Sequence, residues 1–301
     1  MQISNTFKSK ILAAVVENRD NYEGSDSAYA KTLSIGPAIY SRLQKGETDQ
    51  VLSESKWLHI ARILDVKLNE EKWNTARTEV FTKIENDLRN CKKNAAALIM
   101  VDECGIGKTY NARQIVRGMK NSFYLDCSQS KSKQQFIRTL AKTIGCDNKG
   151  RYIDVKADVK YALLFMEQPL IVLDEAGDLD YPAFLELKEL WNATEGTCGW
   201  YMMGADGLRA KIERGINHRK VGYREIFDRF NNKYMKSVPI GAENKEAFYT
   251  KLIGDVLMAN LPTGEQKKLN VYVKKVLATD GGGHGTLRRA KTIVNLLKKA
   301  A

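Results

Sequence analysis

The stretch that decides the fold is AAALIMVDECGIGKT, residues 95–109. Its apolar first half, Ala95–Val101, predicts a buried strand, and Tyr110–Gly118 continues with helical spacing. A strand, a glycine-rich turn, Gly-Lys-Thr and a helix form the pattern of a phosphate-binding loop. Backbone N–H groups of such a loop and of the helix N-terminus surround phosphate oxygens. The sequence therefore predicts a nucleotide site here.

The side chains of this loop have distinct expected roles. Lys108 would place its charge on the β- and γ-phosphates, and the Thr109 hydroxyl would be a ligand of Mg²⁺. The expected nucleotide-binding residues are Glu103, Cys104, Gly105, Ile106, Gly107, Lys108, Thr109 and Tyr110. The loop opens with Asp102 where glycine is usual, and this carboxylate would repel phosphates unless it points away.

A second motif completes the expected chemistry. The apolar run LIVLDE, residues 170–175, predicts a strand that ends in two carboxylates. Asp174 would hold the Mg²⁺ shell, and Glu175 would orient and polarise the attacking water. The two motifs occur in the expected order and on alternating strands. Together they indicate an enzyme that binds a nucleoside triphosphate with Mg²⁺ and hydrolyses it.

Apolar runs alternate with helical segments through the middle of the chain. The runs span residues 95–101, 122–127, 170–173, 199–203 and 234–240. Such alternation predicts an α/β fold, with a parallel sheet of five strands and helices on both faces. After residue 240 the chain is expected to be helical, with a break at Gly281–Gly283 before the last helix.

The first seventy residues predict a small all-α domain. Phe7, Ile11 and Val15 have helical spacing, and a short helix, a turn and another short helix follow. This order is typical of a helix-turn-helix DNA-binding domain. Its recognition helix, Gly36–Gln44, would offer Tyr40, Ser41, Arg42 and Gln44 to DNA. A three-helix protein-interaction module is the alternative, because residues 1–70 carry no net charge.

Composition excludes several other classes of protein. The five cysteines are odd in number and lack C-x-x-C spacing, which argues against a disulfide framework and a structural zinc site. The three histidines are scattered, so a histidine-based metal site or catalytic triad is not expected. No run of eighteen apolar residues is present, so no membrane span is expected. Lys and Arg total 48 against 36 Asp and Glu, and this net charge of +12 suggests a polyanionic partner.

Taken together, the chain resembles the AAA+ ATPases. In that family a polar residue at the end of the strand after the Asp-Glu motif senses the γ-phosphate; here Ala205 cannot, and Asp206 is the nearest substitute. The resemblance implies that an arginine near residue 229 reaches into a neighbouring subunit's site, with Arg229 the first choice and Arg224 the second. Arg288, in Gly285–Ala290, matches the family's lid arginine that points at the phosphates.

Within that family, the order of segments resembles the Mu B group of transposition ATPases. The order is a helix-turn-helix domain (1–70), a connecting helix (71–94, helical over Glu71–Asn90), an AAA+ core (95–240) and a helical lid (241–301). The resemblance implies ATP-dependent helical filaments on duplex DNA, selection of target DNA and activation of a transposase. It also implies slow hydrolysis stimulated by DNA or a partner, and a cytoplasmic protein of bacterial, phage or transposon origin.

The segment after the second strand supplies candidate contacts to the DNA backbone. In AAA+ assemblies this segment tends to line the central channel, and Lys131 and Lys133 with adjacent hydroxyls could contact phosphates there. Lys149 and Arg151 are further candidates. Backbone contacts of this kind would make DNA binding strongly salt-dependent. The alternative is a solvated loop without a ligand.

Two other functions fit the same motifs. A helicase loader or replication-initiation ATPase would bind single strands and a helicase. A transcriptional regulator or antiphage switch would use its ATPase to gate the helix-turn-helix domain, which would then recognise one sequence. Preference for duplex DNA in a filament separates the transposition hypothesis from the first. Removal of residues 1–70 separates it from the second, because only the regulator would lose all DNA binding.

Overall fold

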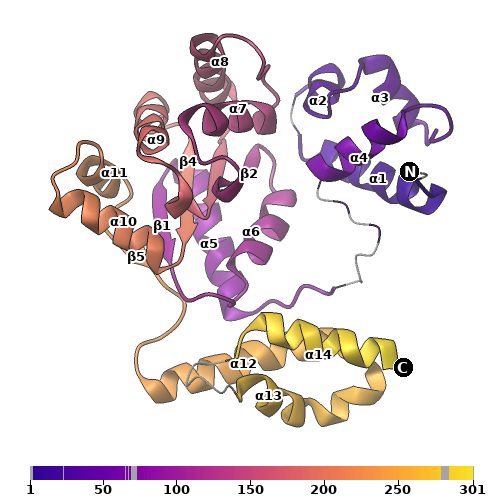
Figure 1. The fold of residues 1–301 in the computed structure, drawn as a ribbon, viewed down its shortest axis with the longest axis vertical. Coiled ribbons are helices and arrows are strands. Elements are labelled where there is room, and N and C mark those ends of the chain that lie inside the picture. The colour runs from indigo at the N-terminus through magenta and orange to yellow at the C-terminus, as the bar shows by residue number, and fades with distance from the viewer. Residues whose placement is uncertain are drawn as a thin grey trace.

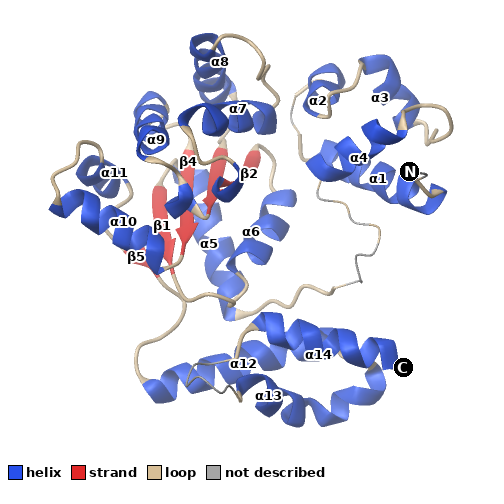
Figure 2. Ribbon diagram, in the orientation of Figure 1, coloured by secondary structure: helices blue, strands red, loops and turns tan. Residues whose placement is uncertain are grey.

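The computed structural model describes residues 3–22, 24–64, 66, 68, 73–278 and 285–300. It consists of a helical N-terminal part, an α/β core and a C-terminal helical lid (Figures 1 and 2). The expected glycine break at 281–283 lies outside the described residues. No helix within the described ranges is long and apolar enough to cross a membrane.

The centre of the core is one parallel sheet of five strands in the order β2-β3-β4-β1-β5. The strands are β1 (Ala97–Val101), β2 (Ser122–Asp126), β3 (Leu170–Asp174), β4 (Gly199–Gly204) and β5 (Tyr234–Met235). The α/β class and the five parallel strands of the sequence prediction are thereby confirmed. Because the strands are parallel, β1 and β3 deliver the glycine-rich loop and the two carboxylates to the same edge of the sheet.

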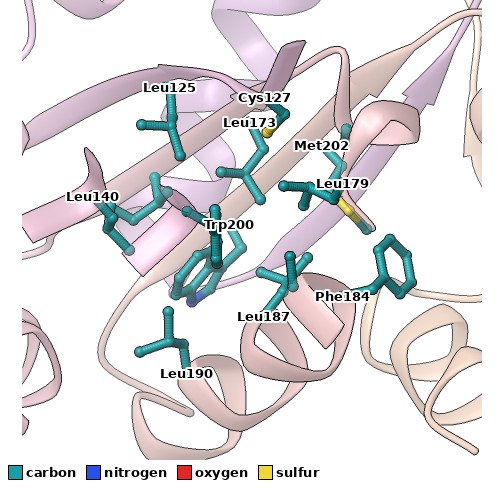
Figure 3. Close-up of a cluster of buried hydrophobic side chains, with 14 of the residues drawn as sticks. Leu125, Cys127, Leu140, Leu173, Leu179, Phe184, Leu187, Leu190, Trp200 and Met202 are labelled. Atoms are coloured by element: carbon teal, nitrogen blue, oxygen red, sulfur yellow. The ribbon is translucent and has the colours of Figure 1, made fainter. Parts of the chain in front are cut away.

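Helices cover both faces of the sheet, and β1 shows why. Its residues are all buried, with Ile99 and Val101 in one apolar cluster and Leu98 and Met100 in the other. Figure 3 shows part of the first cluster, in which Trp200 lies among leucines from the neighbouring helices. The core helices are α5 (Glu79–Asn94), α6 (Lys108–Arg117), α7 (Lys133–Ile144), α8 (Tyr152–Phe165), α9 (Tyr181–Ala193), α10 (Asp206–Asn217) and α11 (Tyr223–Arg229), with 3₁₀ turns at Cys127–Gln129 and Ala176–Asp178.

Helix α5 differs from the expected connecting helix in both position and role. It begins after Thr78, whose hydroxyl accepts a hydrogen bond from the Phe81 N–H. Residues 73–77 are not helical, and the expected start at Glu71 lies outside the described residues. Asn74, inside the expected helix, instead donates its backbone N–H to the Asn260 side chain at 2.8 Å. The helix also packs Ile84 and Leu88 into the cluster beneath the sheet. It is therefore a layer of the core, because its apolar face is buried there.

Strand β5 is shorter than the apolar run 234–240 predicts. It pairs with β1 only at Tyr234 and Met235. The N–H groups of Ser237 and Val238 donate to the carboxylate of Asp102 instead of continuing the ladder. A long-range side-chain acceptor thus ends the strand before the apolar sequence does.

The N-terminal part has its own apolar core. Its helices are α1 (Asn5–Asp20), α2 (Asp26–Thr32), α3 (Pro37–Gln44) and α4 (Glu54–Ile63). One buried cluster includes Phe7, Ile11, Leu33 and Trp57, and it contains no residue of the α/β core. It approaches the core at the end of α7, where a side chain at Gly145 would collide with Tyr22. The predicted helices are confirmed.

The lid packs on the same side of the sheet as α5 and α6. It consists of α12 (Ala242–Asn260), the 3₁₀ turn η3 (Thr263–Lys268), α13 (Leu269–Leu277) and α14 (Leu287–Ala300). Phe248, Leu252 and Val294 share a buried cluster with residues of α5 and α6. The lid is consequently packed on the core beside the glycine-rich loop.

Candidate nucleotide site

The loop between β1 and α6 has the backbone of a phosphate cradle. Gly105 and Gly107 have φ values of 78° and 95°, a region that favours glycine because it has no Cβ. A side chain would collide at Gly105 and would crowd its neighbour at Gly107. A Cβ at Gly105 would lie 2.5 Å from Cβ of Thr286, and one at Gly107 would lie 3.2 Å from a methyl carbon of Leu287. Both glycines are thus required by conformation and by packing against the start of α14.

Lys108 begins α6 and turns back over the loop. Its Nζ donates to the backbone oxygens of Asp102 at 2.8 Å and Glu103 at 2.7 Å. These acceptors are neutral carbonyls, which an anionic phosphate oxygen can replace at a gain in electrostatic energy. Together with the positive end of α6, this arrangement fits the triphosphate of a nucleotide.

Asp174 organises the other side of the site. Its Oδ2 accepts hydrogen bonds from the Thr109 hydroxyl at 2.6 Å and the Tyr124 hydroxyl at 2.5 Å. Its Oδ1 accepts from the Glu175 N–H at 2.9 Å, and the residue is only 2% exposed. Mg²⁺ is commonly held by one or two carboxylates together with phosphate oxygens. The adjacent oxygens of Thr109 and Asp174 are of the type that Mg²⁺ prefers, and phosphate oxygens and water would supply its other ligands.

Glu175 follows directly, with its backbone in the left-handed region at φ 49°. This conformation is uncommon for a residue other than glycine, and the residue is mostly exposed to solvent. Partial burial raises the pKa of its carboxyl group, and the negative charge of Asp174 raises it further. A carboxylate with a raised pKa is a stronger base, which suits the activation of water.

Asp102 resolves the departure at the start of the loop. Its carboxylate is buried and accepts the N–H groups of Glu103, Ser237 and Val238 at 2.9, 2.5 and 3.2 Å. It therefore points toward the segment between β5 and α12. This side chain joins the loop to the start of the lid and satisfies backbone groups that β5 leaves unpaired.

Glu103 makes a second link to the lid. One carboxylate oxygen accepts from Nζ of Lys245 and the other from the hydroxyl of Tyr249, both at 2.6 Å. Lys245 and Tyr249 lie one turn apart on α12, so they reach the same carboxylate. The ion pair raises the pKa of Lys245, and burial raises that of Tyr249. The acidic start of the loop is thus neutralised by the lid.

Sequence reasoning identified Lys108, Thr109 and Asp174, which the structure brings together, but it missed Tyr124. Tyr124 lies in β2, where its ring packs beneath the guanidinium of Arg113 at 4.8 Å. Burial and the charge of Asp174 raise the pKa of its hydroxyl, so it stays a donor to that carboxylate. The only signal in the sequence was the hydroxyl of Tyr124, a polar group within the run 122–127 that was expected to be a strand.

The candidate arginines have different environments. Arg224 is exposed, whereas Arg229 lies over the ring of Trp191 at 5.3 Å, and its Nη1 has no hydrogen-bond partner among the described residues. The structure therefore makes Arg224 the more accessible of the two. Arg288 is exposed on the first turn of α14, next to Leu287, whose N–H donates to the Gly105 oxygen at 3.0 Å.

The end of β4 opens on a cavity of about 530 Å³. Asp206 lines this cavity together with Asp102, Glu103 and the segment 236–242. Asp206 is exposed, and Ala205 before it carries no polar side chain. The position expected to sense phosphate thus holds an acid that lines this cavity between the core and the start of α12.

Most of the candidate DNA contacts in the core are engaged in ion pairs. Lys131 pairs with Asp178 at 2.9 Å, Lys133 with Glu186 at 2.8 Å, and Arg151 with Asp154 at 2.8 Å. Lys149 is exposed. Because the Lys131 and Arg151 side chains are more than half exposed, a phosphate could compete for them at little cost.

In the N-terminal part, Tyr40 is wrong as a DNA contact. It is 2% exposed and packs edge-on against Tyr29, with ring centroids 5.4 Å apart. Its place on the inner face of α3 makes it a core residue. Ser41 and Arg42 are exposed on the same helix, and Arg42 pairs with Glu47 at 2.7 Å.

A match to a protein family supports this description of the core. Residues 93–212 match the model of a protein family described as AAA domain. The core has the AAA+ P-loop NTPase fold. No curated protein matches the chain. A solved structure of the Aeropyrum pernix Orc1 protein in complex with DNA is similar at 13% identity and a TM-score of 0.39, covering 77% of this chain and 86% of that one.

The AAA domain accounts for the site geometry described above. Its matched range contains the glycine-rich loop, Tyr124, Asp174 and Glu175 and ends within α10. The lid and the N-terminal part lie outside this range. Among the described residues, no three His, Cys, Asp or Glu side chains group as a metal site.

Proposed function

We propose that the protein is an ATPase that binds duplex DNA, assembles on it as a helical filament, selects target DNA and activates a partner transposase. The observation that carries the ATPase part is the contact between Thr109 and Asp174 beside Lys108 and the glycine-rich loop. These groups come from β1, α6 and β3 and meet at one edge of the sheet. The sheet order explains their meeting, and no other described cluster has this chemistry.

The residues of the site divide the work of hydrolysis. The loop N–H groups and Lys108 bind and orient phosphates, and Thr109 with Asp174 would hold Mg²⁺, which neutralises charge on the phosphates when bound. Glu175 accepts a hydrogen bond from water and draws its proton toward the carboxylate. The charge of Glu103 is offset by its ion pair with Lys245, and the Tyr249 hydroxyl holds the carboxylate toward α12, so Glu103 opposes the nucleotide less.

The DNA part of the proposal rests on the distribution of charge. Residues 71–240 carry 28 basic and 22 acidic side chains, and residues 241–301 carry 11 and 5, whereas residues 1–70 are neutral. The excess of +12 thus belongs entirely to residues 71–301. This pattern favours backbone contacts made by the assembled core, through Lys131, Lys133, Lys149 and Arg151, with Ser41 and Arg42 as accessory contacts.

Electron microscopy of the protein with long duplex DNA tests the proposal. Filaments are expected with ATP and Mg²⁺ and not without them, and binding should weaken steeply with salt. The Glu175→Gln variant should bind ATP and DNA and stay on DNA longer than the parent, because assembly needs ATP and release needs hydrolysis. Failure of any assembly on duplex DNA would contradict the filament, and faster release of Glu175→Gln would contradict the role of Glu175.

A specific contact also supports the second candidate, an ATPase that gates the helix-turn-helix domain. The N-terminal part lies against the end of α7, where Tyr22 and Thr32 pack on Gly145, and Nη2 of Arg117 on α6 is 3.5 Å from the backbone oxygen of Leu64. A chain lacking residues 1–70 separates the two candidates. If the filament proposal is right, the truncated chain should bind DNA more weakly. If the protein is a regulator, the truncated chain should not bind DNA at all.

A further inference from the structure

Glu175 is followed by the short 3₁₀ turn 176–178, and a lysine of α10 holds this turn in place. Within the turn, the N–H of Asp178 donates to the backbone oxygen of Glu175 at 2.9 Å. Nζ of Lys211, on α10, donates to the backbone oxygens of both residues that flank Asp178. One ammonium group therefore clamps the turn that fixes the direction of Glu175.

Lys131 holds the same turn from the side of β2. Its Nζ lies 2.9 Å from Oδ2 of Asp178, and its backbone oxygen accepts the N–H of Asp180 at 2.8 Å. Strands β2 and β3 are adjacent and parallel, so the segments that follow them leave the sheet side by side. Lys131 thus joins a segment expected to contact DNA to the turn that follows Glu175.

The two segments share a buried base, whereas their charged side chains stay in solvent. Cys127 and Leu179 are both buried in the cluster shown in Figure 3. The side chain of Lys131 is 57% exposed and that of Asp178 is 42% exposed. An ion pair this exposed contributes little free energy, so its partners can be exchanged at little cost. The pair can consequently open while the buried base keeps both backbones on the core.

We propose that DNA phosphates open the ion pair between Lys131 and Asp178, and that this opening transmits DNA binding to Glu175. This regulation rests on the DNA binding of the proposed function and specifies how that binding acts on the ATPase site. A phosphate competes with the Asp178 carboxylate for the same ammonium group. Without DNA the pair is an autoinhibitory contact, because it withholds Lys131 from DNA and fixes the turn.

The carboxylate of Asp178 has a second cation to turn to. Burial lowers the pKa of Lys211, and Asp178 is the foremost of the acidic groups that oppose this lowering. Once released from Lys131, Asp178 is drawn to Lys211 and competes with the backbone oxygens that Lys211 binds. The clamp on the turn then loosens, and Glu175 gains freedom to approach the attacking water. Asp178 is thus the two-state element, with one lysine partner in each state.

The strength of the pair sets the size of the effect. A ligand shifts an equilibrium only by its differential affinity for the two states. Exposed ion pairs correspond to a factor of about 1.4–5 in an equilibrium constant. Lys131→Met opens the pair permanently, so its rate of ATP hydrolysis without DNA should rise by about that factor. Asp178→Asn leaves Lys131 free, so this variant should bind duplex DNA about 1.4–5-fold more tightly than the parent.

Steady-state ATPase rates of the full chain, with and without saturating duplex DNA, test the proposal together with fluorescence anisotropy of a labelled duplex. DNA should stimulate the parent, and the stimulation should be smaller in Lys131→Met and in Asp178→Asn. In the double variant the rate without DNA should fall back below that of Lys131→Met, because no carboxylate then competes for Lys211.

Two controls accompany these measurements. Asp255→Asn removes a carboxylate that is paired with Lys251 on α12, so it matches the change in net charge far from the turn. It should bind DNA and hydrolyse ATP like the parent. The side chains of Lys131 and Asp178 are exposed, so both variants should keep their fold, which circular dichroism spectra check.

The outcomes separate this regulation from simpler roles of the same residues. If Lys131 only contacts DNA, Lys131→Met will hydrolyse ATP at the parental rate without DNA, and the proposal is overturned. If the pair is merely structural, both single variants will be slower than the parent with and without DNA, which also overturns it. In either case, filaments of the parent on duplex DNA leave the proposed function intact. A parent that never binds duplex DNA contradicts the proposed function and this regulation together.

Discussion

Replacing Asp102 by glycine restores the residue that usually opens a phosphate-binding loop, yet we expect it to destabilise this protein. The carboxylate is 4% exposed and accepts three backbone N–H groups. In Asp102→Gly the N–H of buried Val238 loses its acceptor, at a cost of about 1–3 kcal/mol. Ser237 is partly exposed, so water can replace the hydrogen bond of its N–H at a smaller cost. The greater conformational freedom of glycine in the unfolded chain adds roughly 0.5–1 kcal/mol to the destabilisation. The sum is about 2–4 kcal/mol.

Amide hydrogen exchange measures this cost at the residues concerned. The N–H groups of Ser237 and Val238 should exchange roughly 30-fold faster or more in Asp102→Gly, since 2 kcal/mol corresponds to about that factor. The free energy of unfolding of the core, measured in urea, should decrease by a similar amount. Asp206→Asn, an exposed acid on the same cavity, is the control and should change stability by less than about 0.5 kcal/mol. Unchanged exchange at Ser237 and Val238 would refute the argument.

The remaining predictions concern the loop, the water-activating carboxylate and the second strand. In a double-mutant cycle, Glu103→Gln and Lys245→Met should couple by only about 0.2–1 kcal/mol in urea unfolding, because both side chains are over a third exposed; additive effects would contradict the link. The pKa of Glu175 is raised by burial, Asp174 and Asp178, and the base must be ionised, so kcat/KM, which reports the enzyme before ATP and Mg²⁺ bind, should fall on acidification at a pH above the usual Glu range; Asp178→Asn should move that limb of the kcat/KM profile to lower pH, and a shift upward would be inconsistent. Tyr124→Phe should cost about 1–3 kcal/mol in thermal unfolding through the lost bond to a buried carboxylate; a neutral effect would show that water replaces the hydroxyl.

The glycine-rich loop and the acidic strand end could be predicted because their information is local. A strand of five buried residues, two glycines with left-handed backbone and a helix that starts at Lys108 are all consecutive in the chain. The parallel sheet follows from the alternation of strands and helices. That Thr109 and Asp174 meet follows in turn, since parallel strands bring their carboxyl ends to one edge.

Other features depended on contacts between distant residues. The apolar run 234–240 contains no signal that Asp102 will take its N–H groups, so the early end of β5 was not foreseeable. The same holds for Glu103, whose partners lie more than 140 residues away on α12. Tyr40 was placed on the wrong face of its helix, since periodicity alone did not separate the inner face of a short helix from its outer face.

The sequence by itself determined which chemical groups surround the phosphates, because that cradle is built from neighbouring residues and one strand order. Only the tertiary structure decided where the carboxylates of Asp102 and Glu103 point, and therefore that the loop is fastened to the lid. It also decided that α8 keeps an apolar side uncovered, because composition records which residues are apolar and not which of them find a neighbour. The physical reason is the same in each case: a buried polar group or an apolar side chain is satisfied by whatever the fold brings to it, often from far along the chain.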